Sequence, residues 1–322
     1  MKDWLQWGTG LLVAWQSGGS QLVGNVMQSF TFLGSEWFYM LVMPAVLWCF
    51  SASLGMRLGL LLLTSATLNT ICKLALALPR PFWVDERVRA LSVETSFGLP
   101  SGHAQNAVVL WGYLAYTVRR WWATLAAILL ILAISFSRLY LGVHFPGDVL
   151  AGWIVGALVL AVFLLLERPV GRWLKRRSLA TRLLLTVAFS LGFLALGWLA
   201  SNLSARRALP PTWADNFHRA LGASVPFRPG SLDDLVAGAG ALLGFAAGAV
   251  VLDEWGKFTD VRGAWPRLAR FFLGVVVVLA LQVGLSAVLP DGDAFRFLRY
   301  ALLGGWISYG APRLFFAIGL RG

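Results

Sequence analysis

Long runs of apolar residues without a single charged side chain limit what this sequence can fold into. The clearest runs cover residues 37–56, 121–137, 149–166, 183–205, 235–252 and 271–290. Weaker candidates cover 58–72, 104–118 and 300–320, the last of which contains Arg313. A helix of about 20 apolar residues crosses roughly 30 Å of hydrocarbon. Because lipid cannot satisfy backbone polar groups, we expect an all-α fold, a polytopic transmembrane bundle of about nine spans.

Composition supports a membrane class. Hydrophobic residues make up 58% of the 322-residue chain and charged residues only 13%, about half the charged fraction of soluble domains. The net charge of +12 would suggest a nucleic-acid partner in a soluble protein, but the basic residues cluster at the ends of spans, as in residues 167–182. We therefore attribute them to topology and lipid headgroup contact, and predict no nucleic-acid and no protein partner.

The chain shows no internal repeat, and one basic loop divides it. We expect an interfacial or re-entrant segment at residues 1–34, a core at 35–167 and a transmembrane extension at 168–322, all within one membrane domain. The first segment contains Asp3 and no small-residue cleavage signal, which disfavours a signal peptide. Cys49 and Cys72 lie inside apolar spans, so neither a disulfide framework nor a thiolate metal site is indicated.

Polar groups inside a bilayer are costly, and three segments hold most of the unusual ones. The first segment carries Lys73 and Arg80, seven residues apart. Two helical turns separate them, so both cations can lie on one face at a helix end. Taken alone, the pair could equally be snorkelling toward the interface.

The second segment reads ETSFGLPSGHAQN, residues 94–106. Pro100, Ser101 and Gly102 directly precede an apolar run, and the unpaired N–H groups at such a helix start attract anions. Ser101 adds a hydroxyl and His103 an imidazole. Ordinary capping by Ser101, with His103 merely satisfied at the interface, is an equally good interpretation of this segment alone.

The third segment places Arg138 after one apolar run, and His144 and Asp148 at i, i+4 at the start of the next. A carboxylate that accepts from one ring nitrogen leaves the other nitrogen available as a nucleophile or base. For an isolated pair, a structural hydrogen bond is the better interpretation.

Considered together, the segments favour chemistry. Alternating spans bring all three to one membrane face, where they combine three cations, helix-end N–H donors, a hydroxyl and two histidines. This set suits a tetrahedral oxyanion flanked by a nucleophile and a proton donor. The sequence shows no cluster typical of a metal cage and no Walker-type loop. It predicts a phosphate cradle with a proton donor, without metal or other cofactor.

These residues resemble the three-part signature of the type 2 phosphatidic acid phosphatase superfamily. The resemblance rests on three separated motifs in the expected order over residues 35–167: Lys73 with Arg80-Pro81, then Pro100-Ser101-Gly102-His103, then Ser137-Arg138 with His144 and Asp148. The RPFW motif, the lead-in to the second motif and the number of spans are most similar to glucose-6-phosphatase-like and sphingosine-1-phosphate-phosphatase-like members.

The resemblance implies a mechanism. His144 would attack phosphorus and form a phosphohistidine, Asp148 would orient it, and His103 would protonate the leaving oxygen. The phosphoryl oxygens would be held by Lys73, Arg80, Ser101, Gly102 and Arg138. Catalysis by positioning and charge neutralisation agrees with the general chemistry of phosphoryl transfer, and the side-chain cations would replace Mg²⁺.

Other polar residues remain open. Glu94 either steers a substrate hydroxyl or pairs with Arg87 or Arg89. His218 lacks a convincing partner and is expected at the surface. In the extension, structural anchoring is favoured over substrate contact for Arg296, Arg299 and Arg313.

We expect a membrane phosphatase for a phosphorylated lipid, such as phosphatidate, a sphingoid-base phosphate or a polyprenyl diphosphate, which would reach the site laterally. A sugar-phosphate phosphatase is the alternative within the family, and a transporter or binding protein for phosphorylated lipids is the alternative of another class. Binding alone would not need both histidines and Asp148. The distribution of Lys and Arg near span ends predicts a site on the outer face, which is periplasmic in a bacterium and luminal in an organelle, with the C-terminus cytoplasmic. We expect a bacterial inner membrane.

Overall fold

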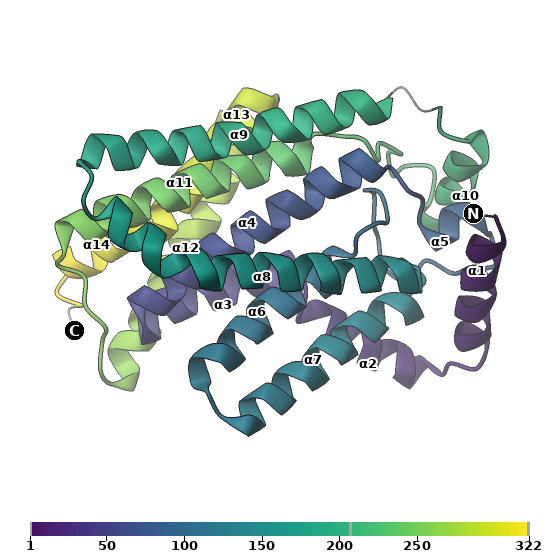
Figure 1. The fold of residues 1–322 in the computed structure, drawn as a ribbon, viewed down its shortest axis with the longest axis horizontal. Coiled ribbons are helices and arrows are strands. Elements are labelled where there is room, and N and C mark those ends of the chain that lie inside the picture. The colour runs from purple at the N-terminus through teal and green to yellow at the C-terminus, as the bar shows by residue number, and fades with distance from the viewer. Residues whose placement is uncertain (1, 206–207, 321–322) are drawn as a thin grey trace. The chain divides into compact units, whose positions relative to one another are not determined.

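The computed structural model describes residues 2–205 and 208–320, and every regular element in these ranges is helical (Figure 1). This confirms the all-α class. In chain order the elements are α1 (Lys2–Ser17), α2 (Gln21–Phe32), α3 (Glu36–Ala45), the π-helix η1 (Val46–Phe50), α4 (Ala52–Leu76), α5 (Pro81–Val84), α6 (Gly102–Val118), α7 (Trp121–Tyr140), α8 (Pro146–Leu174), α9 (Leu179–Ala205), α10 (Pro211–Leu221), α11 (Asp233–Trp255), α12 (Ala264–Val288), α13 (Asp293–Gly305), the π-helix η2 (Trp306–Gly310) and α14 (Ala311–Ala317).

Six described segments are long and apolar enough to cross a membrane, or up to seven if the bent pair Gln21–Phe32 and Glu36–Phe50 is one span. They are Ala52–Val84, Trp121–Tyr140, Pro146–Leu174, Leu179–Ala205, Asp233–Trp255 and Ala264–Val288. The count of nine is therefore not confirmed. Helix α6 has only 17 residues, and the run expected at 300–320 is divided among α13, η2 and α14.

The run expected as one span at residues 37–56 contains a break. Pro44 lies inside α3, and the π-helical turn η1 follows it. A proline lacks the N–H that the helical ladder needs, and π-helical turns commonly absorb such interruptions. Ser51 then adopts an extended conformation (φ −150°, ψ 113°), so α4 begins as a separate helix at Ala52.

The chain divides into two compact units. Unit 1 comprises the described residues of Met1–Glu36, Leu68–Ala161 and Gly197–Leu232, and unit 2 those of Trp37–Thr67, Val162–Leu196 and Asp233–Gly322. The division into segments 1–34, 35–167 and 168–322 within one membrane domain stays a prediction.

In unit 1, helices α6 and α7 pack against each other as a hairpin joined at Arg119 and Arg120, and α2 packs against α7. The start of α8 lies close to the start of α6. A Cβ added at Gly152 would stand 2.7 Å from the Ser101 carbonyl oxygen, and one at Gly156 would stand 2.6 Å from that of Gln105. Small residues four apart thus allow the close helix contact typical of membrane proteins.

An aromatic cluster covers the short helix α5 in unit 1. Buried Trp83 contacts the rings of Phe97, Trp213 and Phe227 at centroid distances of 5.1–6.2 Å. Trp213 belongs to α10, whose apolar residues repeat at helical spacing and pack on α5. Asn216 of α10 also donates a hydrogen bond to the Trp83 carbonyl oxygen at 3.0 Å. The polar segment between α9 and α11 therefore belongs to the same packed unit as the motif residues.

In unit 2, α11 packs against α13, α12 against η1, and α14 against η2. The fully buried Trp48 of η1 donates its indole N–H to the Ile307 carbonyl oxygen at 2.9 Å and meets the Phe315 ring edge-on. The hydrogen bond satisfies the buried indole N–H of Trp48 and links η1 to η2.

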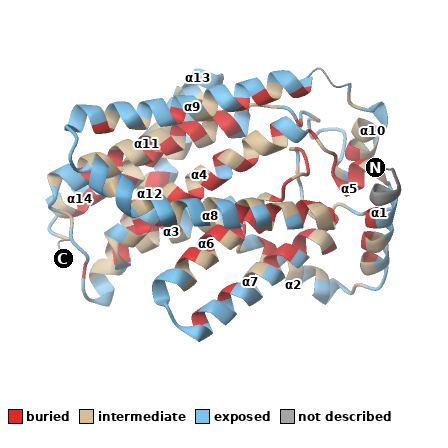
Figure 2. Ribbon diagram, in the orientation of Figure 1, coloured by how far each residue is buried: buried red, intermediate tan, exposed pale blue. Residues whose placement is uncertain are grey.

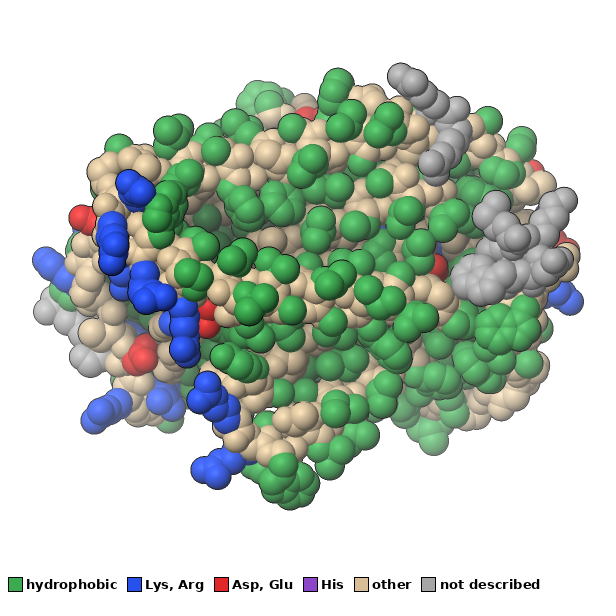
Figure 3. Space-filling model, in the orientation of Figure 1, with side chains coloured by type: hydrophobic (Ala, Val, Ile, Leu, Met, Phe, Trp, Pro, Cys, Tyr) green, Lys and Arg blue, Asp and Glu red, His purple; other side chains and the backbone are tan. Residues whose placement is uncertain are grey.

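Many helices expose apolar side chains. In the most apolar windows of α8, α9 and α12, only 17%, 17% and 11% of residues are buried, and α9 is mostly exposed in Figure 2. The face drawn in Figure 3 is largely hydrophobic, with few charged side chains across its centre. An apolar exterior of this kind is what lipid contact requires and what water would not favour.

Candidate active site

The start of α6 forms the predicted anion cradle. Ser101 is the N-cap: it is fully buried, and its hydroxyl accepts from the Ala104 N–H at 3.5 Å. Its own N–H donates to the Asp148 carbonyl oxygen at 2.9 Å, which ties the cradle to α8. In the described part of the chain, the N–H groups of Gly102 and His103 donate to no acceptor. They form the positive end of the helix, where an anion is stabilised.

Arg80 lies at the centre of the site and is fully buried. Its guanidinium donates to the Val143 carbonyl oxygen at 3.0 Å and lies 3.3 Å from Nε2 of His144. Ser96 contributes its carbonyl oxygen at 2.6 Å from Arg80 Nε, and its hydroxyl accepts from both Arg80 and Lys73, the latter at 2.9 Å. Lys73 and Arg80 therefore share a neighbour, as their spacing predicts.

Arg138 lies in the last turn of α7 and is 1% exposed. Its guanidinium donates to the Thr31 hydroxyl of α2 and pairs with Glu94. Glu94 also accepts from Arg80 at 3.0 Å, so one carboxylate bridges two of the predicted phosphate-binding cations. Burial disfavours the charged form of Glu94, but the attraction of Arg80 and Arg138 outweighs it, and its pKa lies well below the ordinary value.

His144 and Asp148 meet as their spacing predicts. Nδ1 of His144 lies 3.3 Å from Oδ2 of Asp148, and the same oxygen accepts from the Phe145 N–H at 2.9 Å. Gly142, in the preceding turn, has φ +73°, a left-handed conformation that favours glycine. Burial lowers the pKa of the His144 imidazole well below its ordinary value, and the charge of Arg80 lowers it further. In a neutral ring whose Nδ1–H faces Asp148, the lone pair lies on Nε2, which can act as the base or nucleophile and here faces the Arg80 guanidinium.

His103 is half-buried in the first turn of α6. Within the described residues its imidazole makes no hydrogen bond, although it belongs to the same electrostatic cluster as Glu94 and Arg138. A Cβ added at Gly34 would stand 2.9 Å from Cδ2 of His103, so this glycine leaves room for the ring. The structure thus brings all eight predicted site residues into unit 1: Lys73, Arg80, Ser101, Gly102, His103, Arg138, His144 and Asp148.

Two residues of the site were missed or assigned differently from sequence. Thr31 is distant in the chain and carries no motif. The pairing of Glu94 with Arg87 or Arg89 is wrong, because Arg87 pairs with Asp85 and Arg89 bonds to Gln16. The polar composition of residues 94–106 indicated a site. The charged partners of Glu94 come from other parts of the fold, so the spacing of residues in this segment could not identify them.

The remaining polar residues lie elsewhere. His218 packs its ring against Phe217 and Phe227. In unit 2, Arg296 pairs with Asp233, Arg299 donates to Ser286, and Arg313 covers the Trp255 ring. Across residues 2–205 and 208–320, no group of three or more His, Cys, Asp or Glu side chains is placed to hold a metal ion.

Residues 54–172 match the family described as PAP2 superfamily, and residues 236–322 match the one described as PAP2 superfamily phosphatase, transmembrane extension. Glucose-6-phosphatase 3 of Rattus norvegicus is 31% identical over 289 residues, which cover 80% of each chain. Lipid phosphate phosphatase delta of Arabidopsis thaliana is 27% identical over 48% of this chain, and a probable sphingosine-1-phosphate phosphatase of Dictyostelium discoideum is 30% identical over 45%. The chain spans only 41% and 39% of the length of these last two relatives.

Proposed function

The chain belongs to the PAP2 superfamily, and from this premise we propose that it is an integral membrane phosphatase acting through a phosphohistidine. The arrangement of His144 carries the proposal: Nδ1 faces the Asp148 carboxylate at 3.3 Å, while Nε2 faces the Arg80 guanidinium at 3.3 Å. A phosphoryl group bound by Arg80 would therefore be placed beside a neutral imidazole nitrogen.

In the proposed first step, the lone pair of His144 Nε2 forms a bond to phosphorus, and the bond from phosphorus to the ester oxygen breaks. His103 donates its proton to that oxygen, and the alcohol leaves. Asp148 stabilises the positive charge that develops on the His144 ring. In the second step a water molecule gives a proton to His103 and its oxygen forms a bond to phosphorus, while the bond from phosphorus to His144 Nε2 breaks. This releases inorganic phosphate and restores the neutral His144 ring.

The phosphoryl oxygens would be held by the side chains of Lys73, Arg80, Ser101 and Arg138 and the N–H of Gly102. Preorganised donors of this kind stabilise the charge that spreads over the phosphoryl group in the transition state. We propose that these cations take the role that metal ions have in many other phosphatases, so that turnover needs no metal.

A phosphorylated lipid is the proposed substrate. The apolar exterior of the helices allows a lipid to approach from the bilayer, and two relatives are named for lipid phosphates. A sugar phosphate is the second candidate, favoured by the 80% mutual coverage with the rat glucose-6-phosphatase. A transporter or binding role is less well supported, since it would not require the His144–Asp148 pair.

Phosphate release by the purified protein in nanodiscs tests the proposal. The panel would contain phosphatidate, a sphingoid-base phosphate, a polyprenyl diphosphate and glucose 6-phosphate. We expect release from at least one lipid and inhibition by vanadate, which mimics the five-coordinate transition state. Release from glucose 6-phosphate alone would favour the second candidate, and binding without release would favour the third.

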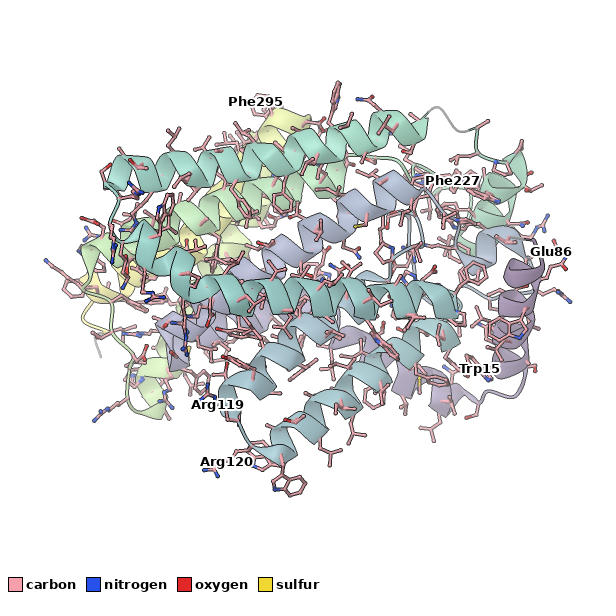
Figure 4. All side chains as sticks on the ribbon, viewed as in Figure 1. Trp15, Glu86, Arg119, Arg120, Phe227 and Phe295 are labelled. Atoms are coloured by element: carbon pink, nitrogen blue, oxygen red, sulfur yellow. The ribbon has the colours of Figure 1, made fainter. Side chains whose placement is uncertain are left out.

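We also propose that the site faces outward from a bacterial inner membrane. Arg119 and Arg120, labelled in Figure 4, lie at the ends of α6 and α7 opposite to the site, next to the exposed Trp121 and Trp122. Tryptophans mark either membrane interface, whereas arginines near span ends are more frequent on the cytoplasmic side, so the arginines support this orientation.

Cysteine labelling in intact cells tests this orientation. Single cysteines at the exposed positions Thr95 and Arg120, in a background lacking Cys49 and Cys72, would be treated with an impermeant maleimide. We expect labelling at position 95 and protection at 120. The reverse pattern would place the site in the cytoplasm.

A further inference from the structure

Glu94 binds the two guanidinium groups that the proposed mechanism assigns to the phosphoryl group. One carboxylate oxygen accepts from Arg80 Nη2 at 3.0 Å, and the other accepts from Arg138 Nη2. Two oxygens of one phosphoryl group would make the same kind of charge-assisted contact to a pair of guanidiniums. The carboxylate therefore occupies contacts that the substrate also needs.

The donors of Arg80 are all in use. A guanidinium has five N–H groups. Nε donates to the Ser96 carbonyl oxygen, and Nη1 to the Val143 carbonyl oxygen and toward His144 Nε2. Nη2 donates to Glu94 and to the Ser96 hydroxyl. The Val143 carbonyl oxygen lies outside the loop that carries Glu94, and His144 is the proposed nucleophile. A phosphoryl oxygen can therefore contact Arg80 chiefly by replacing the Glu94 carboxylate.

Arg138 has donors to spare. It bonds to Thr31 and Glu94 through its two terminal nitrogens, while its buried Nε has no acceptor among the described residues. A buried N–H without a partner is costly, and an incoming anion would satisfy it. Arg138 can therefore begin to bind a phosphoryl oxygen before Glu94 has left Arg80.

Glu94 is charged at neutral pH, because Arg80 and Arg138 hold the pKa of its carboxyl well below the ordinary value. Protonation therefore does not release Glu94 from the two arginines at neutral pH. Displacement has to come from competition with another anion. A phosphomonoester dianion carries more charge than a carboxylate, whereas a phosphodiester carries the same single charge.

The backbone around Glu94 permits the movement. Its neighbours Val93 and Thr95 are exposed, and the loop is anchored on both sides by the hydrogen bonds from Leu91 N to Leu141 O and from Gly98 N to Leu78 O. Between these anchors, residues 92–97 make no backbone–backbone hydrogen bond within the described structure. The side chain can turn outward without the loss of secondary structure.

We propose that Glu94 is a specificity-determining residue whose carboxylate competes with the phosphoryl group for Arg80 and Arg138. A phosphomonoester or terminal diphosphate displaces it, and a phosphodiester does not. The bilayer that surrounds the protein is composed largely of phosphodiester headgroups, so this competition keeps the site accessible to the substrate. The inference rests on the proposed function, because it requires that Arg80 and Arg138 bind the phosphoryl group.

Competitive inhibition by dimethyl phosphate, a soluble phosphodiester, and by inorganic phosphate tests the role. In Glu94→Gln we expect the inhibition constant of dimethyl phosphate to fall at least about tenfold, and that of inorganic phosphate to fall less. Glu86→Gln is the matched control, because Glu86, labelled in Figure 4, is 62% exposed and pairs with Arg219; both constants should stay within about twofold.

An unchanged or weaker affinity of Glu94→Gln for dimethyl phosphate would overturn the proposal, since a carboxylate that merely positions the arginines predicts weaker binding on its removal. If Glu94→Gln is not monodisperse on size exclusion, Glu94→Asp provides the test instead. Its carboxylate keeps the charge, but the shorter side chain cannot reach both guanidiniums. It should bind dimethyl phosphate more tightly than the wild type, and equal or weaker binding overturns the proposal.

Binding can also be followed without turnover, through the rise in Tm that each anion causes. A wild-type protein that hydrolyses no substrate would count against the proposed function. The Tm rise with dimethyl phosphate would still have to be larger in Glu94→Gln than in the wild type, and its absence would refute the role of Glu94 separately.

Discussion

The most deeply buried arginine side chains of the two compact units, each at most 1% exposed, have different hydrogen-bond acceptors. In unit 1, Arg80 and Arg138 share the Glu94 carboxylate, and Arg80 also faces the His144 imidazole. In unit 2, the guanidinium of Arg270 donates to the carbonyl oxygens of Trp48, Thr259 and Leu320 and lies over the rings of Phe258 and Phe315. The guanidinium groups are buried in both environments, but only unit 1 surrounds them with groups that can move away or react.

For Arg80, Arg138 and Arg270, the acceptors distinguish a binding site from a structural anchor. Backbone carbonyls cannot leave without local unfolding, so the donors of Arg270 are permanently occupied and hold α12, η1 and the segment after α14 together. A side-chain carboxylate can be exchanged for another anion. A buried cation is thus no sign of a site by itself, and the comparison predicts different consequences of mutation in the two units.

The strongest test of the comparison between the two units removes the His144 imidazole, which Arg80 faces. We expect His144→Ala to lower turnover at least about 10⁴-fold, because the nucleophile itself is lost, while Tm and the size-exclusion profile stay unchanged. His218→Ala is the matched control and should retain activity. Turnover by His144→Ala close to the wild-type rate would exclude the phosphohistidine.

His103→Ala sharpens the assignment within unit 1. We expect a loss of about 10³-fold for an alkyl phosphate and a much smaller loss for p-nitrophenyl phosphate, whose leaving group needs little protonation. Rates on the two esters from one preparation supply the measurement. Equal losses on both esters would show that His103 is not the general acid.

A matched pair of substitutions compares the two units directly. In Arg138→Lys the charge remains but the planar fork is lost, so kcat/KM should fall about 100-fold with only a small change in Tm. Arg270→Lys should instead lower Tm by several degrees, because carbonyl acceptors lose their donors, and leave kcat/KM of the folded protein within about twofold. If both variants lost activity equally, the distinction between site and anchor would fail.

The smallest expected effect concerns metal removal. Lys73, Arg80 and Arg138 already supply cations to the site, so EDTA should change the rate less than about twofold on a substrate presented in metal-free detergent. A strict Mg²⁺ requirement on a soluble substrate would contradict charge neutralisation by these side chains.

Sequence patterns predicted the helical class and the convergence of the three motifs well. Long apolar runs predict helices because backbone groups in lipid must hydrogen-bond within the chain. The short spacing between residues predicted the His144–Asp148 contact and the capping of α6 by Ser101. The roles of these residues stay predictions. The count of nine spans is not confirmed, because length and hydropathy do not reveal where an apolar run is interrupted, as in residues 300–320, which are divided among α13, η2 and α14.

Contacts between distant segments could not be predicted. The Thr31 hydroxyl reaches Arg138 only because α2 packs against α7, and nothing in the local sequence of Thr31 indicates this. Glu94 has nearby arginines at positions 87 and 89, yet it bonds to Arg80 and Arg138, which other parts of the fold bring closer. Charge partners depend on tertiary packing, and spacing along one chain segment does not contain that information.

The close approach of α8 to α6 at Gly152 and Gly156 has a consequence for biogenesis. Helix α6 emerges from the ribosome before α8, and the Ser101 N–H receives its acceptor from Asp148 only when α8 docks. The nucleophile and the anion cradle are thus made separately and meet at a late stage of helix assembly. A nascent chain that ends between α6 and α7 contains Lys73, Arg80 and Ser101 but lacks Arg138, His144 and the Asp148 acceptor, so its site is still incomplete.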